Sequence, residues 1–298
     1  MSERGKYRSI FSPTSPEEME KNFESYWEYT QEHTGGLLEE EKDLVKKKER
    51  LQYFKDHPVR AKNPIDKEAF YRNYMEFKDD PSKVDRKTLW LTNVYKFARH
   101  EWAGISAAWD AEPVMADSKK LTQKISRLHM AEEFCHARLF YEMLQVFNLD
   151  KAEWALFSPL TQKTYYYFVH LPGLIKDIPA FNMELMGLTF YKHLDVLIDD
   201  VFADEPEAAQ RLRELLYEIT IDELAHLGQR RNFLSPMQVK IAKATTPAWY
   251  RYFFRSCVPE GKYLFNVDKM IQDGLDFDYS LMDDKLIDQS WVPTYCQA

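Results

Sequence analysis

Two short segments of similar pattern, far apart in the chain, most restrict the folds open to it. AEEFCHARLF covers residues 131–140 and ITIDELAHLGQRR covers residues 219–231. Each holds a glutamate followed three residues later by a histidine: Glu133 and His136, then Glu223 and His226. Their neighbours are apolar, and an ionised carboxylate is costly to bury unless something pairs it. Residues three apart share one face of a helix, so each pair could bind one cation, and the repeat favours a metal-binding helical protein.

Helical periodicity dominates the rest of the sequence, which has only nine glycines in 298 residues. The pattern predicts four long helices. Short links join the first to the second and the third to the fourth, so each pair is antiparallel and an all-α four-helix bundle is expected. The four helices are predicted over residues 86–110, 118–147, 179–202 and 206–232. Shorter helices are predicted over residues 15–33, 37–56, 66–76 and 235–255.

We expect one domain over residues 1–298. Residues 1–85 would form a helical cover, 86–232 the metal-binding bundle, and 233–298 a helix followed by an irregular, aromatic tail. The stretch between the second and third long helices is long enough to cross the bundle or to pack on its end.

Composition argues against several classes of protein. The net charge of −8 speaks against a nucleic-acid surface, which would be basic. Three widely spaced cysteines without a CxxC pair fit a reducing compartment. No run of 18 uncharged apolar residues suggests a membrane-spanning helix, and the N-terminus lacks the apolar core of a secretory signal. We therefore expect a cytoplasmic protein with neither nucleic acid nor membrane as partner.

Metal centres in helical bundles also take one glutamate from each of the other two helices. Glu101 lies among apolar and small residues of the first long helix, and Glu184 lies between two apolar residues of the third. Counted from the connecting turn, Glu184 and Glu223 fall at the same level, whereas Glu101 and Glu133 differ by about one helical turn, roughly 6 Å. Asp195, on the same face as Glu184, is a weaker alternative.

Charge balance indicates what this site holds. Two carboxylates about 4 Å apart repel by about 4 kcal/mol even at an effective dielectric constant of 20. Two divalent cations cancel the four negative charges and leave neutral histidines as nitrogen donors. Mixed oxygen and imidazole ligands suit iron or manganese better than calcium. Two divalent ions are therefore expected, with iron, manganese or a mixed pair all open at this point.

An acidic residue precedes each Glu-x-x-His pair. Metal-bound histidines commonly donate their second N–H to a carboxylate, so we expect Asp222 to hold His136 and Glu132 to hold His226. The competing interpretation is that these polar residues cover amphipathic helices. For Glu101 and Glu184 it is a buried ion pair with Lys96 or Lys192.

The sequences EEFCH and DELAH, with single glutamates on the other two helices, resemble the ferritin-like di-iron carboxylate proteins over residues 86–232. That superfamily includes ribonucleotide reductase small subunits, acyl carrier protein desaturases, multicomponent monooxygenase hydroxylases, rubrerythrins and aryl-amine N-oxygenases. The resemblance implies a ferritin-like bundle with two metal ions that uses dioxygen. N-oxygenases have an additional histidine ligand one turn before the glutamate of the fourth helix. Here that position is Ile219, and His129, one turn before Glu133, is the candidate extra ligand.

Three functions remain open. The first is an O₂-dependent oxygenase or oxidase that hydroxylates, desaturates or N-oxygenates a small apolar or aromatic molecule, with electrons from a separate ferredoxin or reductase. The second is a ferroxidase or peroxide scavenger, and the third a radical-generating subunit.

Gly104 and Gly187 are candidates to leave room for a substrate, and Tyr191 is a candidate for a pocket or radical residue. A cavity beside the metals would favour the first function, a narrow filled site open to solvent the second, and a tyrosine bonded to a ligand the third. The sequence leaves open whether the chain forms a homodimer.

Overall fold

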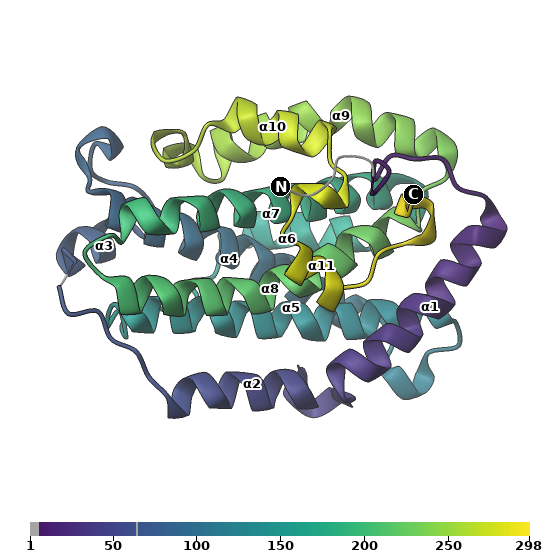
Figure 1. The fold of residues 1–298 in the computed structure, drawn as a ribbon, viewed down its shortest axis with the longest axis horizontal. Coiled ribbons are helices and arrows are strands. Elements are labelled where there is room, and N and C mark those ends of the chain that lie inside the picture. Colours follow the sequence, from purple (N-terminus) through teal and green to yellow (C-terminus); the bar gives the residue numbers. More distant parts are fainter. Residues whose placement is uncertain (1–5, 64) are drawn as a thin grey trace.

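The computed structural model describes residues 6–63 and 65–298, and its architecture is all-α, as predicted (Figure 1). One two-stranded antiparallel hairpin, β1 (Leu37–Leu38) and β2 (Asp43–Leu44), is the only sheet in these two ranges. The α-helices are α1 (Pro16–Thr34), α2 (Val45–Asp56), α3 (Lys67–Asn73), α4 (Arg86–Ala111), α5 (Leu121–Val146), α6 (Pro159–Val169), α7 (Gly173–Val201), α8 (Pro206–Arg231), α9 (Pro236–Ser256), α10 (Val267–Leu275) and α11 (Asp284–Gln289).

Four long helices, α4, α5, α7 and α8, form the centre of the molecule, close to the ranges predicted from the sequence. The Asp85 side chain caps α4 by accepting a hydrogen bond from the Thr88 amide, and Pro206 starts α8. Residues 112–120 join α4 to α5 and residues 202–205 join α7 to α8, so both pairs are antiparallel. The pairs pack through α5 against α8 and, more lightly, α4 against α7.

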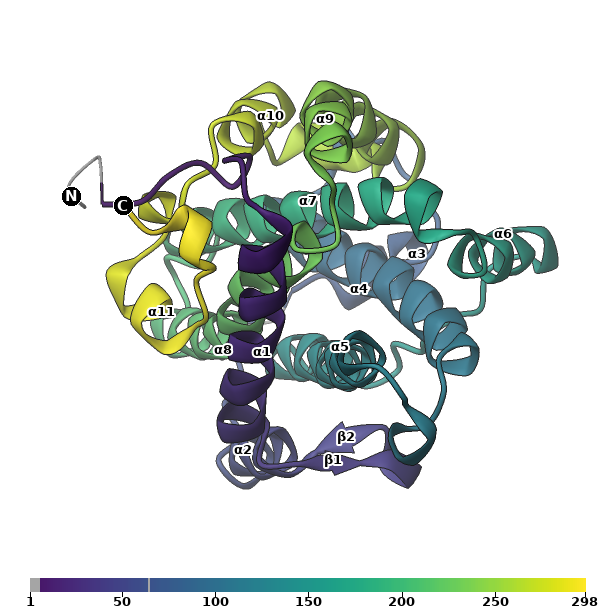
Figure 2. The same ribbon diagram turned by 90° about the vertical axis from the view of Figure 1, so that its right-hand side faces the viewer.

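The remaining helices cover this centre (Figures 1 and 2). Helices α1 and α2 pack on α5, α6 on α4, α9 and α10 on α7, and α11 on α8. The two ends of the described chain meet: the Arg8 amide donates to the Cys296 carbonyl (2.8 Å) and the Ile10 amide to the Phe277 carbonyl (3.0 Å). None of the helices in the described ranges is both long and apolar enough to cross a bilayer.

The prediction of a helix over residues 37–56 is wrong in its first third, where the β1–β2 hairpin precedes α2. The hairpin buries Leu44 completely, in a cluster with Trp109 and Phe134. It also brings Asp43 to Arg138 (3.2 Å). A continuous helix would give up both contacts, so tertiary packing overrides the local helical pattern.

Two further boundaries differ from the prediction. Helix α7 begins at Gly173, six residues early, and contains Pro179. Pro179 removes one backbone hydrogen bond, but neighbouring helices hold the first turns: Lys176 Nζ donates to the Val169 carbonyl and Gln238 Nε2 to the Leu174 carbonyl. The tail after residue 256 is also less irregular than expected, since it forms α10 and α11.

Candidate metal centre

The two Glu-x-x-His pairs face each other across the interface between α5 and α8. All four side chains are buried, and both histidines are fully enclosed. His136 Nδ1 lies 3.1 Å from Glu223 Oε1 and 3.4 Å from Glu133 Oε2. His226 Nδ1 lies 3.1 Å from Glu133 Oε1. The i,i+3 spacing thus directs both pairs to one point.

Glu101 reaches the same cluster from α4. Burial, followed by the charges of Glu133 and Glu223, raises the pKa of Glu101 well above its usual value. Glu101 Oε1 accepts a hydrogen bond from the Tyr191 hydroxyl, which is completely buried. Glu101 and Glu133 were expected to differ in height by about one helical turn, but they are close enough for their charges to interact.

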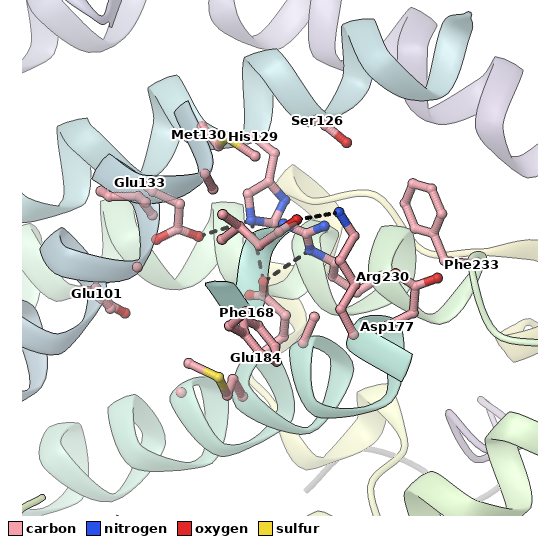
Figure 3. Close-up of a pocket in the computed structure, with 18 of the residues that line it drawn as sticks. Glu101, Ser126, His129, Met130, Glu133, Phe168, Asp177, Glu184, Arg230 and Phe233 are labelled. Carbon is pink, nitrogen blue, oxygen red and sulfur yellow. Dashed lines mark hydrogen bonds and ion pairs between the residues drawn. The ribbon is translucent and has the colours of Figure 1, made fainter. Parts of the chain in front are cut away.

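Glu184 approaches from α7 on the other side of Glu133. Its Oε1 lies 3.3 Å from His129 Nε2 and accepts a hydrogen bond of 3.3 Å from Arg230 Nε (Figure 3). His129 Nε2 also lies 3.2 Å from Glu133 Oε1, and its ring stacks on His226 with centroids 3.8 Å apart. The structure therefore brings the candidate extra ligand His129 into the cluster.

Neither lysine forms the ion pair that competed with metal binding, although Arg230 pairs with Glu184 at 3.3 Å. Lys96 Nζ pairs with Glu260 Oε1 at 2.6 Å, and Lys192 Nζ lies 3.4 Å from Asp273 Oδ2. Asp195, the weaker alternative to Glu184, faces Arg213 instead, at 3.7 Å.

Potential ligand atoms gather in two overlapping groups of four residues, within each of which they lie no more than 4.8 Å apart. Both groups contain Glu133 and His226, and this sharing is what a pair of neighbouring ions needs. Glu101 belongs to neither group, although it acts electrostatically on members of the second. The first group is His129, Glu133, Glu184 and His226; the second is Glu133, His136, Glu223 and His226.

Both hydrogen bonds expected behind the histidines are present. His136 Nε2 lies 3.0 Å from Asp222 Oδ2, and His226 Nε2 lies 2.7 Å from Glu132 Oε2. When each Nε2–H donates to its carboxylate, the Nδ1 lone pair is left facing the cluster. This is the tautomer that a metal ligand requires.

Asp222 has two further partners that the sequence did not reveal. Its Oδ1 accepts a hydrogen bond of 2.6 Å from the buried Lys47 ammonium and lies 3.0 Å from His33 Nε2. Burial alone would raise the pKa of Asp222, but the Lys47 charge and the hydrogen bonds from His136 and His33 hold it well below its usual value. Asp222 therefore remains a carboxylate that can orient His136.

The carboxylates of the cluster are crowded. Burial and the charge of Glu133 raise the pKa of Glu223 to about 8. Several buried ligand atoms lie close to one another but make no well-directed hydrogen bond, and such atoms are rare in folded proteins. They are Nδ1 of His129, His136 and His226, Oε1 of Glu223 and Oε2 of Glu101. Cations among these atoms would satisfy them and offset the carboxylate charge, so the residues present fit a metal centre.

A cavity of about 280 Å³ adjoins the cluster, and Figure 3 shows Glu101, Glu133 and Glu184 at one end of it. Gly104 and Gly187 both line it, as predicted. A Cβ atom at Gly104 would approach nothing more closely than 3.8 Å. Tyr191 is not a lining residue; it lies behind Glu101.

Polar residues beyond Glu184 also line the cavity and were not foreseen. Figure 3 shows Asp177 and Arg230 on the side away from Glu101 and Glu133, and Lys176 is a further lining residue. At the end of α8, Arg231 donates a hydrogen bond to the Leu234 carbonyl. Arg230 instead donates to Glu184 of α7, whose Oε1 lies 3.3 Å from Arg230 Nε.

The chain matches no protein-family model, and comparisons with curated proteins and with solved structures found no match. The resemblance to ferritin-like proteins therefore depends on the residues and geometry described above.

Proposed function

We propose that the chain is a non-haem di-iron, O₂-dependent oxygenase or oxidase built on a ferritin-like bundle. The observation that carries the proposal is the position of the 280 Å³ cavity beside buried carboxylates and histidines with unpaired ligand atoms. A cavity of this kind, mostly apolar with a few polar groups, is typical of small-molecule sites. A small organic substrate could lie within reach of the metals.

Glu133, His136, Glu223 and Glu101 would hold one ion. Glu133, Glu184 and His226, with His129 as an additional ligand, would hold the other. Iron in such a site, once reduced, supplies the activation of dioxygen that no side chain provides. Four ionised glutamates and neutral histidines would balance two divalent ions, as the charge argument requires.

The chain's own residues have three tasks. Asp222 and Glu132 fix the ring orientation and tautomer of His136 and His226. The apolar lining, including Met130 and Phe168, limits water around the substrate. Tyr191 donates a hydrogen bond to Glu101 Oε1 and so orients that carboxylate. Reducing equivalents would come from a separate ferredoxin or reductase, and the three free cysteines support a cytoplasmic setting.

One observation favours a second candidate, a radical-generating subunit. Tyr191 is fully buried and donates to the candidate ligand Glu101, as a redox-active tyrosine would. The ferroxidase alternative has less support, because the site opens into a cavity rather than being filled.

Anaerobic titration with Fe(II), followed by exposure to dioxygen, tests the proposal. We expect two iron ions per chain, rapid O₂ uptake and oxidation of at least one member of a panel of small aromatic amines, alkenes and fatty acids. His136→Ala should lose one ion and O₂ reactivity while keeping its helical circular dichroism. A tyrosyl signal in electron paramagnetic resonance that Tyr191→Phe abolishes would favour the radical function. O₂ uptake with ferric-oxide formation alone would favour the ferroxidase.

A further inference from the structure

Large apolar side chains gather on one outer face, formed by α6, the start of α7 and the start of α9. We call it the α6–α9 face. Isolated exposed apolar residues are ordinary, but a contiguous group of them marks an interaction surface. The face is defined by six residues, 42% to 77% exposed: Leu160, Tyr167, Leu174, Ile175, Met237 and Ile241.

Contacts between the three helices make this face continuous. Gln238 Nε2 donates to the Leu174 carbonyl, which joins the start of α9 to the start of α7. Lys176 Nζ donates to the Val169 carbonyl, which joins the end of α6 to α7. Figure 2 shows α6 at the edge of the molecule, outside α4 and α7. Helix α6 packs on α4 with one side only, and none of its residues is fully buried, so its outward apolar residues are left uncovered.

The charge of the face is opposite to that of the chain. The chain carries a net charge of −8, yet residues 154–176 and 224–259 contain no Asp or Glu. Asp177, the first acid after these segments on α7, lies in the cavity, and Asp268 of α10 faces Arg251 at 3.7 Å. The exposed cations of α6 and of the first half of α9 are Lys163, Lys240 and Lys243, whereas Arg251 and Arg255 lie near the other end of α9.

These charges identify the kind of occupant. In a twofold dimer formed through this face, the same surface meets itself, so the cations would oppose cations. An anionic partner is complementary. Exposed leucine, isoleucine and tyrosine beside lysines are typical of helices that lie in the headgroup region of a bilayer.

We propose that the α6–α9 face binds peripherally to an anionic lipid bilayer. The proposal departs from the expectation of no membrane partner, which depended on the lack of a spanning segment and of a secretory signal, since interfacial binding needs neither. Phe168 and Val169 of α6 and Met183 of α7 line the cavity, and Met183 is also 39% exposed. The cavity thus adjoins the face, and bilayer contact brings it close to the lipids. The proposal does not depend on the metal centre.

Cosedimentation with vesicles of 70:30 phosphatidylcholine and phosphatidylglycerol at 0.1 M salt tests the proposal. We expect the full chain to bind these vesicles, with or without metal, and to bind pure phosphatidylcholine more weakly. Leu160→Ser and Leu174→Ser should each weaken partitioning about tenfold. Lys163→Gln and Lys240→Gln should each weaken it about fivefold, on anionic vesicles only.

Two control variants lie elsewhere on the surface. Val196→Ser replaces a 69% exposed apolar residue near the other end of α7, and Lys62→Gln removes an exposed cation; both should bind as the wild type does. The proposal is overturned if the wild type stays in the supernatant, as it would if the face served an acidic protein. It is also overturned if the leucine variants bind normally, or if light scattering shows a dimer that Leu160→Ser dissociates.

Discussion

Asp222 connects the candidate metal ligand His136 to a buried cation, so Asp222→Asn tests the electrostatic account of the site. An asparagine keeps the volume but offers one oxygen and one NH₂ group to three partners. In the wild type, Lys47 Nζ lies 2.6 Å from Asp222 Oδ1 and His136 Nε2 lies 3.0 Å from Asp222 Oδ2. In the variant, the NH₂ group must face one of these two nitrogens. In both cases a donor meets a donor, and Lys47 loses its ion-pair partner in the interior.

Removing one partner of a buried ion pair costs about 3–5 kcal/mol. The entropy of unfolding for a chain of this length is about 0.6 kcal/mol/K, so metal-free Asp222→Asn should melt about 5–8 °C below the metal-free wild type. Loss of the carboxylate behind His136 should also weaken metal binding about 10–100-fold. Differential scanning calorimetry of chelated protein and titration with Fe(II) or Mn(II) measure the two effects.

Asp195→Asn is the matched control, since Asp195 is about half-exposed and its pairing with Arg213 is loose. Exposed pairs of this kind contribute about 0–1 kcal/mol. Lys47→Met in the Asp222→Asn background removes the stranded cation and should restore much of the stability, but not the metal affinity. Unchanged melting and unchanged metal affinity in Asp222→Asn would refute the reasoning.

Three further predictions concern other parts of the molecule. Gly104→Leu adds a side chain at a lining position where the Cβ atom meets nothing closer than 3.8 Å, so it should keep both metal ions but oxidise bulky substrates at least tenfold more slowly; equal rates would place the substrate elsewhere. Asp273 has a pKa below its usual 3.8, because hydrogen bonds from Lys269 and His193 outweigh the effect of burial. A lowered folded-state pKa stabilises the fold above the unfolded value and loses that effect as the pH falls. Asp273→Asn should therefore be less stable than the wild type in urea at pH 7, with the difference shrinking below about pH 3.8; a pH-independent difference would count against the ion pair. Chelation of the wild type should lower its melting temperature by about 4 °C for each ion that is bound at 100 times its Kd, and unchanged melting would argue against the site.

Much of the fold was predictable because the long helices follow the 3.6-residue period closely. The Glu-x-x-His spacing then determines which side chains share a face, so the convergence of Glu133, His136, Glu223 and His226 could be foreseen. The rise per residue alone did not determine the height of Glu101 along the bundle relative to Glu133. Its place depends on the conformation of residues 112–120, which no pattern specifies.

Other features depend on contacts between segments that are distant in sequence. Lys47 reaches Asp222 only because the β1–β2 hairpin sets the position of α2, and the sequence predicted helix there. Three consecutive lysines that follow three glutamates are typical of a solvated charged face, so the pattern does not indicate a buried Lys47. Arg230 lies near the end of α8, where a cation commonly caps the helix, and its partner Glu184 comes from α7. A charged residue repeating at the period of the buried face would have been the available signal for Lys47.

Anomalous diffraction from crystals grown with Fe(II) or Mn(II) tests the central claim most directly. The account predicts two peaks about 3.5–4 Å apart, both bound by Glu133, with His136 on one ion and His226 on the other. Crystals that show no peak among these side chains, or a single ion held elsewhere, would contradict it.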